Sequence, residues 1–168
     1  SLRRVEQIQS ICHNKQKKLV VYLSMAFGNP YGDPWSSDIV TEWGSRLANE
    51  FGVTILAPSD TIGTSNPDNI RDIFGTMIRE MPDVEIGAHL HTTPDKWEEK
   101  IEAVIESGCR RIDGALKGFG GCPMAKDDLT GNMPTENVIS YLEKHDMSPD
   151  LHKDALKVAL GMAGSVLG

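Results

Sequence analysis

The chain has 168 residues, of which 39% are hydrophobic and 24% charged, as in ordinary soluble proteins with one substantial core. Lys and Arg number 17 against 24 Asp and Glu, so the net charge is −7, which argues against nucleic acid or an anionic membrane as a partner. No apolar run approaches the roughly 20 residues of a membrane span, and no signal segment opens the sequence. The three cysteines have no paired spacing and indicate free thiols in a reducing compartment, so we expect a cytoplasmic protein.

Strands and helices are expected to alternate along the chain. Four short apolar runs predict buried parallel strands; they are Leu19–Met25, Val53–Ala57, Glu85–His91 and Arg110–Leu116. Helices are expected after each of them, with a leading helix over about residues 3–13 and a trailing one over about residues 149–163. Four pairs of a capping residue and a proline predict helix starts; they are Asp33-Pro34, Asn66-Pro67, Thr93-Pro94 and Ser148-Pro149. A further helix is expected over Thr135–Lys144.

The spacing of the strands is that of a βα repeat, and two architectures fit it. One is an open doubly wound sheet and the other is part of a (β/α)8 barrel, which in full needs about 250 residues. Both folds place their sites at the carboxyl ends of the strands, so the position of the candidate residues leaves the choice open.

The segment around His89 and His91 carries the strongest chemical signal. Side chains alternate along a strand, so the two imidazoles are expected on one face, where they would form half of a metal site. Two further segments follow, a glycine-rich loop with Cys122 over 118–123 and a polar segment over 130–136. Together these features suggest a metal-dependent carbon–carbon lyase.

Each candidate residue also has a plainer interpretation. Taken alone, the two histidines would be incidental and Cys122 an inert thiol. Asp60 would cap the turn before Gly63, and Glu136 would be a favourable first-turn acid of a helix. Asp113 would either face a barrel interior or pair with a neighbouring arginine, Arg110 or Arg111.

Four motifs in order resemble the hydroxymethylglutaryl-CoA lyase family. They are Ser59–Gly63, His89–His91, Gly120–Pro123 and Gly131–Glu136, and the run Val20–Phe27 into Gly28–Gly32 resembles that family's fifth strand and loop. The resemblance covers roughly residues 18 to 165. The Gly-Gly-Cys-Pro loop is its most specific element, because related Claisen-type synthases usually carry Gly-Glu-Arg there.

The resemblance implies a fold and an activity. The fold would be α/β, the C-terminal half of a TIM (β/α)8 barrel with four parallel strands and covering helices. Residues 1–168 would then be a single partial domain that lacks the N-terminal half of the barrel. The activity would be cleavage of 3-hydroxy-3-methylglutaryl-CoA to acetyl-CoA and acetoacetate, with an acyl-CoA or related small molecule as substrate.

The resemblance also assigns roles to individual residues. His89, His91 and Asn132 would bind a divalent cation, Mg²⁺ or Mn²⁺ in the first place and Zn²⁺ as a further option. Cys122 would be the catalytic thiol. Glu136 would support the site, and Asp60 would lie near substrate and metal.

Two departures from the family pattern bear on function. The Arg-Asp pair of the family's first strand is absent, so we expect the isolated chain to be inactive. Thr92 stands where the family usually has aspartate, which leaves open a related aldolase or Claisen-type synthase. A half-barrel module without catalysis is the third alternative. The two outer strands of a half-barrel, Leu19–Met25 and Arg110–Leu116, would have unpaired edges, and its inner face would be open and apolar. Both features predict a homo-oligomer.

Overall fold

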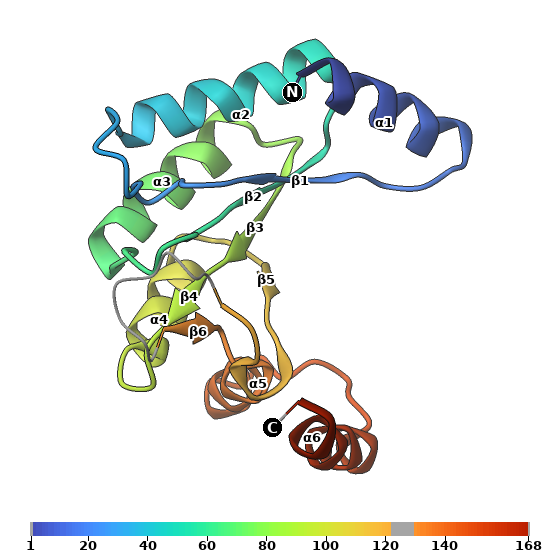
Figure 1. Ribbon diagram of the computed structural model, residues 1–168, viewed down its shortest axis with the longest axis vertical. Helices are drawn as coiled ribbons and strands as arrows, with labels where there is room; N and C mark the ends of the chain where they lie inside the picture. Colours follow the sequence, from blue (N-terminus) through green and yellow to red (C-terminus); the bar gives the residue numbers. More distant parts are fainter. Residues whose placement is uncertain (1, 122–129, 168) are drawn as a thin grey trace.

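The protein is described by a computed structural model over residues 2–121 and 130–167 (Figure 1). Its centre is a parallel sheet of order β1-β2-β3-β5. The strands are β1 Val20–Leu23, β2 Ile55–Pro58, β3 Glu85–His89 and β5 Arg111–Asp113. All four predicted strands are confirmed, although each is shorter than its apolar run. The outermost strands are β1 and β5, as expected for half of a barrel.

Six α-helices are described, and the core forms where three of them meet the sheet. Their bounds are α1 Leu2–Asn14, α2 Ser37–Phe51, α3 Pro67–Glu80, α4 Trp97–Glu106, α5 Thr135–Lys144 and α6 Lys153–Leu167. One face of the sheet, including Leu56 and Ala88, packs against fully buried α3 residues such as Phe74 and Met77. None of the helices in the described ranges has the length and hydrophobicity of a transmembrane segment.

One of the four predicted helix starts is right. The side chain of Asn66 accepts hydrogen bonds from Asp68 N and Asn69 N and forms a capping box at α3, with Pro67 in the first turn. Helix α2 instead begins after Ser36, whose hydroxyl accepts from Ile39 N.

The other two starts are also displaced towards the C-terminus. Helix α4 begins only at Trp97 because the Thr93 hydroxyl bonds to the Asp95 carboxylate instead of capping the helix. Helix α6 begins at Lys153, where His152 Nδ1 accepts from Ala155 N. Asp33 stays in a loop because Asn29 Oδ1 accepts its backbone N–H.

The segment expected as one strand over Glu85–His91 divides at Leu90. Its last part, β4 (His91–Thr92), leaves the main sheet and pairs antiparallel with β6 (Gly131–Asn132). Leu90 stays in the core, and its carbonyl accepts from Met133 N instead of from a neighbouring parallel strand. The division brings the loop that precedes α5 against the end of β3.

The sheet face opposite the core is largely polar at β3 and β5, whereas Val20, Ile55 and Ala57 keep it apolar at β1 and β2, so the expectation of an apolar open face holds only in part. In the register of the sheet, Glu85, His89, Arg111 and Asp113 share this face with Tyr22. Arg111 lies 3.4 Å from Glu85 and 3.7 Å from Asp113, and the Tyr22 hydroxyl donates to Asp113 over 2.6 Å. Exposed charged and hydroxyl groups do not drive association as an apolar face would.

Candidate metal centre

Two imidazoles lie side by side where β3 passes into β4. The ring centroids of His89 and His91 are 5.7 Å apart. Both rings line an open depression of about 340 Å³ at the carboxyl ends of the strands, together with Tyr22 and Thr61. The intervening Leu90 is 1% exposed and faces the core, so the two histidines lie on the opposite side of the strand.

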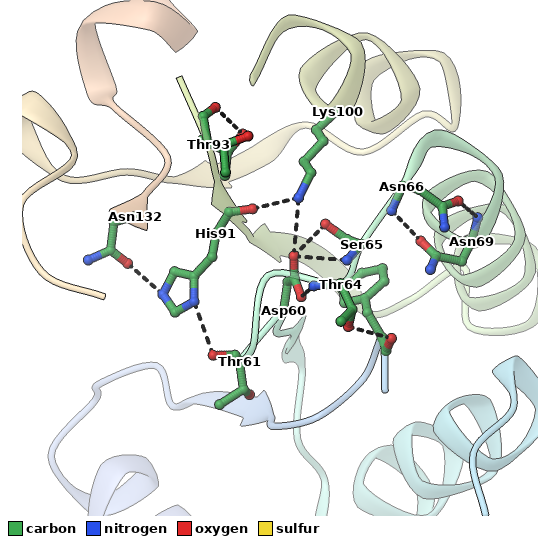
Figure 2. Close-up of polar contacts among 12 residues, drawn as sticks. Asp60, Thr61, Thr64, Ser65, Asn66, Asn69, His91, Thr93, Lys100 and Asn132 are labelled. Carbon is green, nitrogen blue, oxygen red and sulfur yellow. Dashed lines mark hydrogen bonds and ion pairs between the residues drawn. The ribbon is translucent and has the colours of Figure 1, made fainter. Parts of the chain in front are cut away.

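His91 is held between two polar groups, as Figure 2 shows. Its Nδ1 lies 3.2 Å from the Thr61 carbonyl oxygen, and its Nε2 lies 3.1 Å from Asn132 Oδ1. The Asn132 amide nitrogen donates to the Phe119 carbonyl over 2.8 Å, which fixes the direction of the amide oxygen. In the neutral tautomer with its one proton at Nδ1, His91 donates that proton to the Thr61 carbonyl oxygen. Nε2 then turns its lone pair towards another acceptor.

A cation between His91 Nε2 and Asn132 Oδ1 would satisfy the lone pairs of both atoms. In an octahedral site with ligands at ~2.1 Å, neighbouring ligand atoms are about 3.0 Å apart. The observed separation of 3.1 Å between His91 Nε2 and Asn132 Oδ1 fits that spacing. Within the described ranges no three His, Cys, Asp or Glu side chains gather as a metal site, and the donor that faces His91 is the amide oxygen of Asn132. The donor set therefore fits a divalent cation.

His89 is oriented by two residues that sequence reasoning did not assign. Its Nδ1 lies 3.7 Å from the Asp113 carboxylate, which also accepts from the Tyr22 hydroxyl. Burial, together with the nearby His91, lowers the pKa of His89 and so favours the neutral form that binds metals. Both alternatives left open for Asp113 hold, because it shares the inner face with His89 and also pairs with Arg111. Side chains alternate along each strand, and this alternation could have predicted from the sequence that Tyr22 and Asp113 lie on the same face as His89.

Asp60 lies behind His91 and not in the depression. Its carboxylate is fully buried and accepts from Thr64 N, Ser65 N and the Ser65 hydroxyl. Lys100 completes the set as an ion pair at 3.4 Å. The structure thus places Asp60 in the turn-capping position that the sequence left as an alternative.

The remaining two candidates are Glu136, in the first turn of α5, and Cys122, in the sequence of the glycine-rich loop. Glu136 accepts from the backbone N–H of Lys117, a residue with φ 57°, and so fastens the turn before the loop to α5. Cys122 lies outside the described residues. The last described residues before it are anchored beside the site, because Gly120 O accepts from Asn132 N and the backbone of Gly121 lies against Thr130.

Cys109 is the cysteine whose chemistry the structure settles. Burial against the sheet raises the pKa of its thiol to about 11. We therefore expect iodoacetamide at pH 8 to modify the partly exposed Cys12 of the native protein far faster than Cys109, because the thiolate is the nucleophile. Peptide mass spectrometry measures both. In urea the two rates should converge, and equal native rates would contradict the prediction.

Comparisons with known proteins agree with the fold and the resemblance. The HMGL-like family model matches residues 3–160. Hydroxymethylglutaryl-CoA lyase YngG of Bacillus subtilis (strain 168) is 29% identical over 159 residues, which are 93% of this chain and 52% of that relative. The chain thus spans about half the length of that relative.

Solved structures show the same correspondence. The crystal structure of the Bacillus subtilis HMG-CoA lyase superposes with a TM-score of 0.87 at 27% identity, covering 98% of this chain and 54% of that one. An Acinetobacter baumannii HMG-CoA lyase in complex with coenzyme A and 3-methylmalate gives a TM-score of 0.80 at 25% identity, over 96% of this chain and 52% of that one. The half-barrel interpretation is confirmed in preference to the open sheet, and the chain belongs to the HMGL-like family.

Proposed function

We propose that the parent of this chain is a metal-dependent carbon–carbon lyase that cleaves 3-hydroxy-3-methylglutaryl-CoA to acetyl-CoA and acetoacetate. The observation that carries the proposal is the approach of His91 Nε2 and Asn132 Oδ1, which face one another at 3.1 Å beside a second imidazole. The similarity to named lyases supports the substrate class, and the Acinetobacter relative holds coenzyme A.

His89, His91 and Asn132 would hold the cation, with Mg²⁺ or Mn²⁺ as the first choice and Zn²⁺ as the second. Such an ion supplies an electrophile for substrate oxygens and lowers the pKa of a bound hydroxyl. The reaction removes the proton of the tertiary hydroxyl, breaks the carbon–carbon bond and returns a proton to the departing enolate carbon. Cys122 is proposed to carry out a proton transfer. Glu136 would support the site by fastening the turn at Lys117 to α5.

A related aldolase or Claisen-type synthase is the second candidate, favoured by Thr92. A threonine has no carboxylate to offer where the family usually has one. Its side chain is buried, and its hydroxyl donates to the Thr93 carbonyl. Assays of the full-length parent on 3-hydroxyacyl-CoAs and on 4-hydroxy-2-oxo acids separate the two. Free thiols at Cys12 and Cys109 support a reducing compartment, and we place the parent in the cytoplasm.

Metal binding by the chain itself is the direct test. We expect Mn²⁺ to bind weakly, because two imidazoles and one amide supply no carboxylate. His91→Ala should weaken this binding by at least about tenfold, since it removes a ligand. Loss of a residue that only orients a ligand already lowers metal affinity by about tenfold or more. Electron paramagnetic resonance of free Mn²⁺ measures the affinity.

The matched control is His13→Ala, an exposed histidine on α1. It should bind Mn²⁺ like the original chain. Equal affinity of the His91→Ala variant would show that the ion binds elsewhere, and the proposal of this metal centre would fail.

The exposed edges of β1 and β5 are proposed to pair between copies of the isolated chain. Each edge carries unpaired backbone groups, and an apolar groove of about 670 Å³ beside β1 is lined by residues such as Val5, Trp35 and Trp43. We expect a dimer at micromolar concentration in sedimentation velocity, and an inactive one because it would lack the Arg-Asp pair of the family's first strand. A monomer across the whole concentration range would contradict this prediction.

A further inference from the structure

Lys100 is a charged residue buried directly behind the candidate metal centre. It projects from α4, and its side chain is 2% exposed. Its ammonium group donates to the backbone carbonyl of His91 over 2.8 Å and lies 3.4 Å from the Asp60 carboxylate, as Figure 2 shows. Lysine is almost never fully buried unless it is paired, so these two contacts call for an explanation.

The explanation lies in the bend between β3 and β4. Three consecutive carbonyls, of His89, Leu90 and His91, stand at the point where the chain leaves the parallel sheet. The first accepts from Asp60 N over 2.9 Å and the second from Met133 N over 3.1 Å. The third accepts from the side chain of Lys100. A lysine thus takes the place of a backbone donor that a continuous sheet would have supplied.

Asp60 joins both histidines through this arrangement. Its backbone N–H binds the carbonyl of His89, and its carboxylate binds the ammonium group that holds the carbonyl of His91. The carboxylate is itself fixed by the turn at Thr64 and Ser65. The backbones of both candidate ligands are therefore bonded to the two members of one buried ion pair, His89 to the Asp60 backbone and His91 to the Lys100 ammonium group.

We infer that Lys100 is a positioning residue: it clamps the His91 backbone at the bend and so keeps the imidazole in register with Asn132 for one shared cation. This inference rests on the proposed metal centre. Lys100 and Asp60 act through the His91 carbonyl and do not touch the cation.

The test separates positioning from simple charge. The double variant Asp60→Asn/Lys100→Met removes one charge of each sign and leaves the His91 carbonyl without its donor. The matched control is Arg71→Met/Glu106→Gln, which removes the same charges from an exposed pair between α3 and α4. Mn²⁺ affinity is measured for both double variants and for Lys100→Met alone, at a temperature where circular dichroism shows each to be folded.

We expect the Asp60→Asn/Lys100→Met variant to bind Mn²⁺ at least about tenfold more weakly and the control to bind unchanged, because residues that orient metal ligands are worth that much. The direction of the change in Mn²⁺ affinity for Lys100→Met alone is decisive. If the lysine were only a nearby positive charge, its removal would tighten the binding of a cation, whereas loss of positioning weakens it.

A second readout does not depend on metal. Long-range ¹H–¹⁵N spectra of the histidine rings should show one tautomer for His91 in the original chain, protonated at Nδ1, and mixed tautomers in the Asp60→Asn/Lys100→Met variant. Unchanged affinity with an unchanged ring spectrum would overturn the inference. If the original chain bound no Mn²⁺, the proposed metal centre would fail, and the ring spectrum would still decide whether Lys100 positions His91.

Discussion

Replacing Cys122 with alanine in the full-length parent should lower kcat by about 10²–10⁴-fold, the usual contribution of a positioned general acid or base. The reason is chemical, because a thiol can return a proton to the enolate and a methyl group cannot. KM should change far less, since the interaction is made in the transition state. Cys122→Ser should also lose most of kcat, because a hydroxyl is a much weaker acid than a thiol. Steady-state kinetics on 3-hydroxy-3-methylglutaryl-CoA measure both constants.

The control for this prediction is Cys109→Ala, whose thiol is buried under the sheet and has a raised pKa. That variant should keep kcat, although it costs some stability. Full activity of Cys122→Ala would return Cys122 to the interpretation as an inert thiol, and the proton transfer would then belong to another group. The structure adds that the chain leading to Cys122 is bonded to Asn132 through Gly120, next to the proposed cation.

The parallel sheet could be predicted from the sequence because its signals are local. The four strands are short apolar runs, and the capping box of Asn66 with Pro67 marks the start of α3. The displaced starts of α2 and α4 have a different cause. There the expected capping residue is held within its own loop, Asp33 through its backbone N–H and Thr93 through its hydroxyl, and such contacts depend on how that loop folds.

The positions of the candidate ligands could be predicted from the sequence, but the contacts that support them could not. Alternation along one strand places His89 and His91 together, and the order of the motifs adds Asn132. The division of the strand at Leu90 could not be seen, because it depends on Met133, more than 40 residues later in the chain. The role of Lys100 could not be predicted for the same reason, since the sequence alone indicates one more solvent-exposed charge on a helix.

The buried pair that this lysine forms should be one of the largest single contributors to the stability of the chain. Lys100→Met leaves the Asp60 carboxylate with no exposure to solvent and no countercharge. Breaking a buried pair from one side costs about 3–5 kcal/mol, a large part of the roughly 5–15 kcal/mol that holds a domain folded. Urea unfolding at several protein concentrations measures the loss and accounts for self-association.

The comparison variants isolate the cause of that loss. Asp60→Asn/Lys100→Met should recover more than half of the stability lost in Lys100→Met, because it no longer buries an unpaired charge. Arg71→Met breaks an ion pair whose two side chains are 44% and 53% exposed, and should cost less than about 1 kcal/mol. If Lys100→Met cost no more than Arg71→Met, the Asp60 carboxylate would be satisfied by Thr64 and Ser65 alone. The ammonium group would then bind the His91 carbonyl without contributing to the free energy of unfolding. The stability experiment therefore reports on the contact of Lys100 with Asp60, and the metal-affinity experiment on its contact with His91.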